Sequence, residues 1–339
     1  MKGISLPDPD MAPQNPPNLA IAYVHFYVDD LNAWQTWFQK TFPLEAINFR
    51  ETFPFLPAQT VQLSGPDLTL MLSAPQTECD TVAQYLKKHP CGVADIAFYI
   101  DQLDTFHGDD RGQGVKVICN HVGFRHTLIY RRHIPKTNQK IDHLVLNVPD
   151  GKLPQTVQWY EDNFGFNRRQ RFTIQTNYSG LASQVLVHPS GIQLPINQPG
   201  DRQSQIQEFL DYNHGAGIQH IALKCHNLPA QIHAFRQNGL AFLEVPESYY
   251  QNLLERYPHL GQQPDWRQLK QEKILIDVVR SPGEILLQIF TQPIFKEPTF
   301  FWEFIERKQQ AQGFGEGNFQ ALFEAIEQAQ RQRLVSPRP

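Results

Sequence analysis

Apolar and polar residues alternate in four short stretches of this chain, as they do in β-strands that cover a core. These stretches are 22–28, 92–100, 141–148 and 217–225. Each of them leads into a segment for which we expect a helix, and these segments are 29–40, the residues from Asp104 onward, 153–164 and 228–239. The first helix would begin on acidic residues and carry an apolar stripe through Leu31, Trp34 and Trp37. The pattern therefore indicates a strand and helix motif that occurs four times.

The four motifs alternate in form as A, B, A, B, which is the mark of an internal repeat. Further short strands with Gly and Pro between them follow each opening, as at 185–188, 192–196 and 274–279. We therefore predict an α+β fold of four βαβββ modules, paired into two domains. The predicted domains are 18–135 and 136–339, with a polar boundary near Lys136–Lys140, and 1–17 is a proline-rich, flexible tail.

Composition excludes several classes of function. The net charge is −4, and no long run of Lys and Arg is present, so nucleic acid and anionic membrane are not expected partners. No apolar run approaches the roughly 18 residues of a membrane helix, and residues 1–10 lack the apolar segment of a signal peptide. We expect a cytoplasmic protein.

A candidate metal site involves Glu303, which lies in the aromatic stretch Phe300–Phe304. A buried carboxylate requires a strong positive partner, and a metal ion is the strongest one. His143 and His220 stand early in the strands at 141–148 and 217–225. Two histidines and one carboxylate on separate strands form the ligand set of a non-haem Fe(II) oxygenase.

The first half of the chain lacks this set. His25 corresponds to His143 in the repeat, but Asp95 stands where the alignment places the second histidine. The late strand at 126–132 contains no carboxylate. We therefore predict that the domain at 18–135 binds no metal and that His25 has a structural role.

Residues 140–330 carry a dense set of motifs. They include Ile141-Asp-His143, Leu194-Pro-Ile-Asn197, Gly215-Ala-Gly-Ile-Gln-His220, Leu286-Leu-Gln-Ile-Phe-Thr and Gly313-Phe-Gly-Glu-Gly-Asn-Phe319. With the four modules, these motifs resemble the 4-hydroxyphenylpyruvate dioxygenase family of the vicinal oxygen chelate superfamily. The resemblance is much weaker in the first 135 residues.

The resemblance implies an iron-dependent oxidoreductase of tyrosine catabolism. His143, His220 and Glu303 would bind Fe(II), and the substrates would be 4-hydroxyphenylpyruvate and O2. Oxidative decarboxylation, ring hydroxylation and side-chain migration would give homogentisate and CO2. We also expect a homo-oligomer. The implied substrate pocket consists of Ser183, Asn197, Gln205, Gln219, Gln288, Phe290, Phe301, Phe314, Asn318 and Phe319.

Three alternatives remain open. In 4-hydroxymandelate synthase, which shares substrate and iron site, the segment around Pro195 and Asn197 and the residue at Phe290 differ, so this chain favours the dioxygenase. Extradiol catechol dioxygenases share the fold and ligand types but not the 313–319 segment. A metal-free binding protein of the same fold is the third alternative.

The segment from Phe319 has apolar residues at helical spacing, through Leu322, Phe323 and Ile326. We predict a closing helix over the iron pocket, with the glycines at 313–317 as its hinge. The alternative is a core helix packed permanently on the domain.

Overall fold

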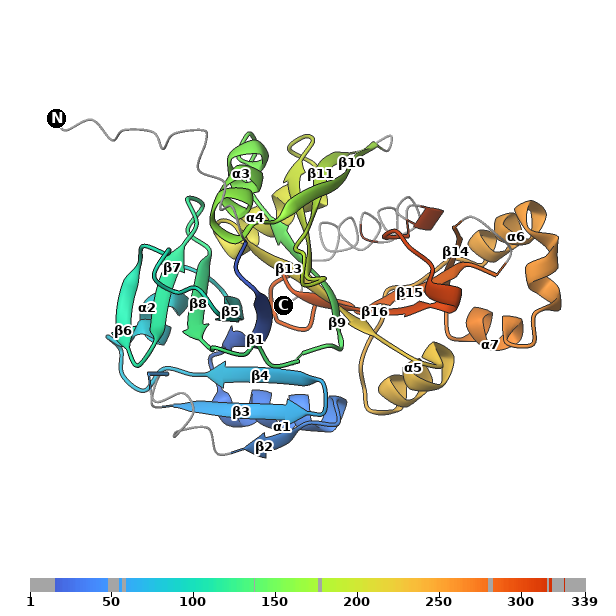
Figure 1. The fold of residues 1–339 in the computed structure, drawn as a ribbon. Helices are drawn as coiled ribbons and strands as arrows, with labels where there is room; N and C mark the ends of the chain where they lie inside the picture. Colours follow the sequence, from blue (N-terminus) through green and yellow to red (C-terminus); the bar gives the residue numbers. More distant parts are fainter. Residues whose placement is uncertain are drawn as a thin grey trace.

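The computed structural model describes residues 16–47, 55–56, 59–136, 138–175, 179–279, 283–315, 317–318 and 326. These residues form two eight-stranded sheets, and each sheet uses one continuous half of the chain. The two sheets lie side by side, the blue-to-green one beside the one coloured green to red (Figure 1). The chain passes from one sheet to the other through the segment between Tyr130 and Ile141, which contains the predicted domain boundary.

The first sheet has the strand order β2-β3-β4-β1-β5-β8-β7-β6. Its strands are β1 (Leu19–Tyr27), β2 (Glu45–Ile47), β3 (Thr60–Gly65), β4 (Leu68–Ser73), β5 (Gly92–Ile100), β6 (Asp109–Gly112), β7 (Val115–Cys119) and β8 (Arg125–Tyr130). Strands β1 and β5 form its antiparallel centre, and β1 pairs with β4, and β5 with β8, in parallel.

The second sheet repeats this arrangement in the order β10-β11-β12-β9-β13-β16-β15-β14. Its strands are β9 (Ile141–Asn147), β10 (Asn167–Gln175), β11 (Gly180–Val187), β12 (Gln193–Pro199), β13 (Gly217–Lys224), β14 (Leu275–Val278), β15 (Ile285–Phe290) and β16 (Phe301–Arg307). The centre is again antiparallel, between β9 and β13. The internal repeat and the α+β modules that the sequence predicts are therefore confirmed.

Most of the helices connect strands within one module. They are α1 (Leu31–Thr41), α2 (Thr81–Leu86), α3 (Leu153–Phe164), α4 (Gln205–Asn213), α5 (Leu228–Gln237), α6 (Glu247–Arg256) and α7 (Trp266–Gln271), with short 3-10 helices at Pro258–Gln262 and Lys308–Gln310. The α1 helix begins where Asp30 accepts a hydrogen bond from the backbone N–H of Ala33. The α3 helix ends at Gly165 in the left-handed conformation.

The second module departs from the predicted pattern. The segment from Asp104 contains turns instead of a helix, since β5 ends at Ile100 and β6 begins at Asp109. Residues 101–108, all of which are described, are too few to form a helix and its two connections. The corresponding connection in the fourth module holds α5, α6 and α7, and α6 and α7 extend furthest from the first sheet (Figure 1).

Aromatic rings join the two halves. Phe26 on β1 packs edge-on against Phe300 at 5.2 Å between ring centroids and lies 6.1 Å from Trp302 on β16. In a further contact between the two halves, Phe164 of α3 packs on Phe98 of β5 at 5.5 Å between ring centroids. These contacts belong to one buried cluster that contains residues from both sheets. Truncating one such buried ring to alanine typically costs about 3–5 kcal/mol.

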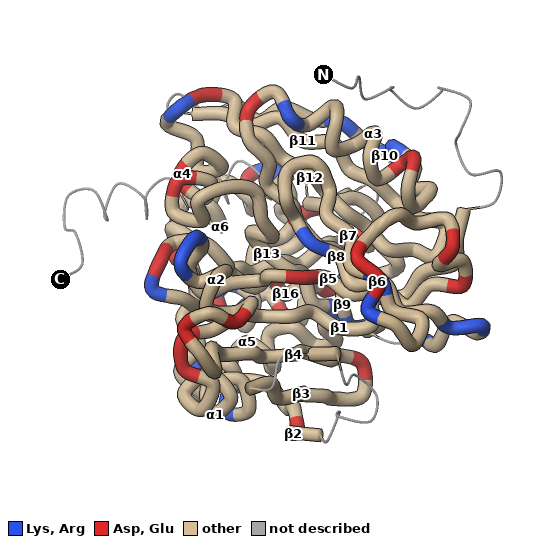
Figure 2. The backbone as a smooth tube through the Cα atoms, turned by 90° about the vertical axis from the view of Figure 1, so that its left-hand side faces the viewer, with Lys and Arg blue, Asp and Glu red and all other residues tan. Residues whose placement is uncertain are grey.

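Charged residues of both signs occur throughout the described chain. Figure 2 shows Lys and Arg interspersed with Asp and Glu around a largely uncharged centre. Among the described helices, none has both the length and the apolar character of a membrane span.

Candidate metal centre

The three predicted metal ligands come from three neighbouring strands of the second sheet. His143 lies on β9, His220 on β13 and Glu303 on β16. His143 stands opposite Ala222, which in turn stands opposite Glu303. His220 lies two residues before Ala222, so the alternation along a strand points all three ligands to one face of the sheet.

All three side chains are buried, and their ligand atoms converge. Glu303 Oε2 lies 3.1 Å from His143 Nε2 and 3.5 Å from His220 Nε2. The possible ligand atoms of the three residues lie within 4.8 Å of one another. Among the described residues these two imidazoles and one carboxylate form the cluster, and three ligands on one face fit a divalent first-row metal that keeps open coordination positions.

A buried ion pair orients His143. Its Nδ1 donates to Asp142 Oδ1 at 2.9 Å, which leaves Nε2 to face Glu303. Arg307 donates to both oxygens of Asp142, from Nε at 2.9 Å and from Nη2 at 2.7 Å. Sequence analysis missed both roles. Asp142 adjoins a predicted ligand, but Arg307 is 165 residues away in sequence, and only the strand order brings it close.

A single amide joins Glu303 to the segment that follows β16. Gln288 Nε2 donates to Glu303 Oε1 at 2.9 Å and to the carbonyl of Phe314 at 3.0 Å. Gln288 Oε1 accepts from Asn318 Nδ2 at 2.9 Å. The backbone of Gly315 lies against the side-chain amide of Gln288 and has φ near 80°. A Cβ at this position would collide with Gln288 Oε1. This position therefore requires glycine.

The electrostatics of the site favour a positive charge next to Glu303. Burial opposes ionisation of Glu303, but the two histidines outweigh it and lower the pKa of its carboxyl group to about 2. Burial also opposes the charged form of His143, yet Glu303 and Asp142 raise its pKa to about 9. For His220, burial prevails and lowers the pKa. A bound cation would supply the positive charge that these carboxylates attract.

The ligands stand at the wall of a cavity of about 80 Å3. Seven of the predicted pocket residues line it, namely Asn197, Gln205, Gln219, Gln288, Phe290, Phe301 and Phe314. The ring of Phe301 stacks on His220 at 4.8 Å, and that of Phe314 meets His143 edge-on at 5.4 Å. Apolar residues that the sequence did not single out complete the wall, namely Val145, Phe172, Ile174, Leu181 and Ile206.

The remaining predicted pocket residues lie elsewhere. Ser183 is buried on β11 opposite Asn197 but does not line the cavity. Asn318 is also buried and reaches the site through Gln288. Phe319 and most of the predicted closing helix lie outside the described residues. Ile326 of that segment is described, and it lines the cavity.

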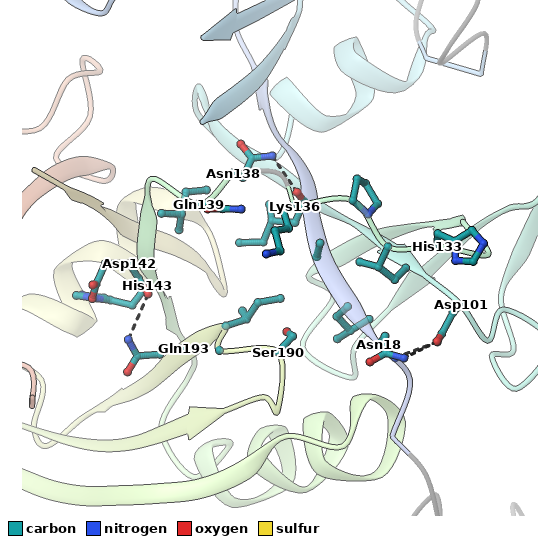
Figure 3. A pocket seen from close by; sticks show the side chains of 18 of the residues that line it. Asn18, Asp101, His133, Lys136, Asn138, Gln139, Asp142, His143, Ser190 and Gln193 are labelled. Atoms are coloured by element: carbon teal, nitrogen blue, oxygen red, sulfur yellow. Dashed lines mark hydrogen bonds and ion pairs between the residues drawn. The ribbon is translucent and has the colours of Figure 1, made fainter. Parts of the chain in front are cut away.

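A larger cavity, of about 920 Å3, lies between the two sheets beside the segment that connects them. Its side chains are mostly polar and include Asn18, Asp101, Lys136 and Gln193 (Figure 3). It shares only His143 with the lining of the metal cavity and lacks its ring of aromatic residues. The smaller cavity is therefore the candidate site, since it contains all three ligands.

In the first sheet, the strand pairing agrees with the predicted alignment of Asp95 with His220 but not with that of His25 with His143. The central strand pairs of the two sheets have β-bulges at corresponding positions. Tyr23 stands opposite Ala97 as His143 stands opposite Ala222, and His25 stands opposite Asp95 as Val145 stands opposite His220. Asp95 also stands opposite Arg125, as His220 stands opposite Phe301, so Arg125 corresponds to Phe301.

Comparisons with known proteins agree with this geometry. A family model described as the Glyoxalase/Bleomycin resistance protein/Dioxygenase superfamily matches residues 140–262. A 4-hydroxyphenylpyruvate dioxygenase of Caenorhabditis elegans is 32% identical over 93% of each chain. Another, from Legionella pneumophila, is 46% identical over 57% of this chain and 55% of its own length.

The fold also matches a solved structure. A mutant of 4-hydroxymandelate synthase from Streptomyces coelicolor superposes with a TM-score of 0.79 at 24% identity, over 93% of this chain and all of that one. At this identity the likeness concerns the fold alone. The full-length match to the nematode enzyme shows that the chain belongs to the 4-hydroxyphenylpyruvate dioxygenase family of enzymes, on the vicinal oxygen chelate fold.

Proposed function

We propose that this chain binds Fe(II) through His143, His220 and Glu303 and converts 4-hydroxyphenylpyruvate and O2 to homogentisate and CO2. The observation that carries the proposal is the convergence of these three buried ligands on one cavity with phenylalanine walls. Relatives named for this activity, at 32% and 46% identity, support the choice of substrate. Bound here, Fe(II) would be chelated by the 2-oxo acid group of the substrate and would supply dioxygen activation.

The polar residues of the cavity would bind the two ends of the substrate. Asn197, Gln205 and Gln219 place amide groups on a surface that is otherwise apolar. Gln205 Oε1 is buried and has no hydrogen-bond partner among the described residues. It can therefore accept a hydrogen bond from a phenolic hydroxyl, which would offset the cost of leaving a buried acceptor unpaired.

The aromatic residues would hold the substrate ring and exclude water. Phe290, Phe301 and Phe314 are all buried, and Phe314 is fixed through its carbonyl by Gln288. A cavity of about 80 Å3 is well below the roughly 300–1,000 Å3 of most small-molecule sites. Substrate entry therefore requires part of the wall to move, and exclusion of water afterwards protects reactive species from side reactions.

The test is anaerobic reconstitution of the full chain with Fe(II), followed by 4-hydroxyphenylpyruvate and oxygen. We expect homogentisate, identified by mass and retention time, and one iron per chain. His143→Ala, His220→Ala and Glu303→Ala should each abolish tight iron binding and turnover, because each removes one of three ligands. Circular dichroism would verify that the variants fold.

His25→Ala is the matched control, since His25 is a buried histidine on a central strand of the first sheet. We expect it to leave the iron content at one per chain. Hydroxymandelate as the main product would select the synthase reaction instead. Two irons per wild-type chain, or loss of iron in His25→Ala, would refute the assignment of a single metal centre.

A further inference from the structure

The first sheet contains a second cavity, at the place that corresponds to the metal cavity of the second sheet. It has a volume of about 230 Å3 and is lined by His25, Asp95 and Arg125, among others. These three residues stand in one row across β1, β5 and β8, at the places that Val145, His220 and Phe301 hold across β9, β13 and β16. In this half of the molecule an arginine therefore takes the place of Phe301, which lines the metal cavity.

Arg125 has more hydrogen-bond donors than the protein satisfies. Its Nη2 donates to the hydroxyl of Tyr27 at 2.7 Å, and its guanidinium lies over the Tyr27 ring at 5.1 Å from the centroid. The Nε atom is buried without a partner, and the described residues accept only this one hydrogen bond from the five N–H groups of an arginine. A partly buried guanidinium with free donors is a binding group for an anion.

The nearby carboxylate does not occupy these donors. Asp95 is fully buried, and its two oxygens accept from the backbone N–H of Thr127 at 2.8 Å and from the Thr127 hydroxyl at 2.7 Å. Asp95 offsets the charge of Arg125 through space but makes no ion pair with it within 4.0 Å. An external anion can therefore still approach the guanidinium.

The remaining walls of the cavity limit the size of the ligand. Leu56 and Val117 contribute apolar surface, and Gln76 and Thr81 contribute polar groups. Its volume lies just below the range of ordinary small-molecule pockets, which suits a compact ligand. Carboxylates match the planar fork of an arginine, and an apolar body would contact the aliphatic lining.

We propose that this N-terminal cavity binds a small organic monocarboxylate on Arg125 and Tyr27, without a metal ion. The hydroxyl of Tyr27 accepts from Arg125, so its own proton remains available to a carboxylate oxygen. The site is distinct from the metal centre and does not depend on the proposed reaction.

Benzoate is a suitable probe, with benzamide as its neutral isostere, titrated into the metal-free full chain by calorimetry. We expect saturable binding of benzoate and much weaker binding of benzamide. Arg125→Gln should weaken benzoate binding by roughly tenfold or more, because it removes the positive charge and the paired N–H donors of the guanidinium group. Arg111→Gln is the matched control, because Arg111 lines the same cavity but is exposed and paired with Asp109. It should change the affinity by less than about twofold.

Several results would overturn the proposal. These are the absence of saturable benzoate binding, equal affinities for benzoate and benzamide, or an unchanged benzoate affinity in Arg125→Gln. The last result would place the benzoate in another cavity of the protein. If Arg125→Gln does not fold, Tyr27→Phe decides the question. We expect it to weaken benzoate binding a few-fold, and an unchanged affinity would count against the site.

Discussion

Phe290 stands edge-on to two other rings of the metal cavity. Its ring lies 6.5 Å from that of His220 and 6.3 Å from that of Phe301, at interplanar angles of 85° and 77°. It is buried, so its volume sets the shape of the cavity beside the proposed metal ligands. The position of the substrate ring relative to the metal should therefore depend on this side chain.

We predict that Phe290→Leu diverts part of the product from homogentisate to hydroxymandelate. A smaller side chain lets the substrate shift, so that its benzylic carbon rather than its ring carbon meets the oxidant. The product ratio, measured by chromatography with mass detection, tests this prediction. Phe172→Leu is the control, since Phe172 lines the same cavity from β10. An unchanged ratio in Phe290→Leu, or equal shifts in both variants, would show that Phe290 does not select the product.

Among individual residues, the sequence predicted those whose role can be recognised from their neighbours along the chain. Glu303 is conspicuous because a carboxylate within an aromatic strand demands a cationic partner. The roles of Asp142 and Arg307 could not be predicted, because nothing near either residue in the sequence identifies its partner. Arg125 was missed for a related reason, since its place in a cavity beside Asp95 and Tyr27 depends on the strand pairing.

At the scale of elements, Arg307 connects three segments of the second sheet. From β16 it donates to Asp142 on β9, and its Nη1 donates to the carbonyls of Ala311 at 3.0 Å and Gly313 at 2.8 Å. One side chain thus fixes the neighbour of a proposed metal ligand and the backbone that leads to Phe314. Removing it would leave Asp142 ionised, buried and held only by His143.

We predict that Arg307→Gln lowers Fe(II) affinity by about 10–100-fold, the usual effect of losing a residue that orients a metal ligand. Hydrogen exchange at 311–315 should become faster in the same variant, because two carbonyls lose their donor. Fe(II) titration and mass-detected exchange measure the two effects.

Arg168→Gln is the matched control. Arg168 makes a similar two-point contact with Glu161, but on the exposed surface. It should leave iron affinity and exchange at 311–315 unchanged, since exposed ion pairs contribute little. Normal iron affinity in a folded Arg307→Gln protein would refute the orienting role.

Element boundaries were predictable where periodicity and end signals coincide. The strand at 92–100 and the helix at 153–164 match β5 and α3 at both ends. The strand at 22–28 was placed too late, since β1 begins at Leu19, directly after the turn residues Pro17 and Asn18. The predicted helix from Asp104 was wrong because local spacing does not show how close the next strand lies.

At the scale of the molecule, His126 lies where the two halves meet. It belongs to β8 of the first sheet, and its Nε2 is hydrogen-bonded to the hydroxyl of Tyr160 on α3 at 2.8 Å. Its Nδ1 contacts the carbonyl of Ile96 at 3.0 Å. Burial lowers the pKa of His126 to about 4, so the folded protein keeps this imidazole neutral.

We predict that the chain loses stability as the pH falls from about 6.5 towards 4. The unfolded chain binds a proton at His126 below about 6.5, whereas the folded chain resists until about 4. Neutral His126 therefore contributes its full stabilisation, about 3 kcal/mol, above pH 6.5. This contribution is lost as the pH falls to about 4. Urea unfolding of the metal-free chain at several pH values measures it.

His126→Asn should reduce the slope of the unfolding free energy against pH by the equivalent of about one proton taken up on unfolding. Part of the slope should remain, since burial also lowers the pKa of His188 to about 4. Replacement of the exposed His133 by Asn is the control and should preserve the slope. An equally steep loss in His126→Asn would assign the effect to other groups.

The aromatic contacts between Phe26 and the rings beside Glu303 have a consequence for the second half of the chain. Phe300 and Trp302 belong to the same short segment as Glu303, and they pack against Phe26 of the first half. An isolated second half would expose these rings to water and to other copies of itself. The second half is therefore expected to associate through these rings when it is produced alone.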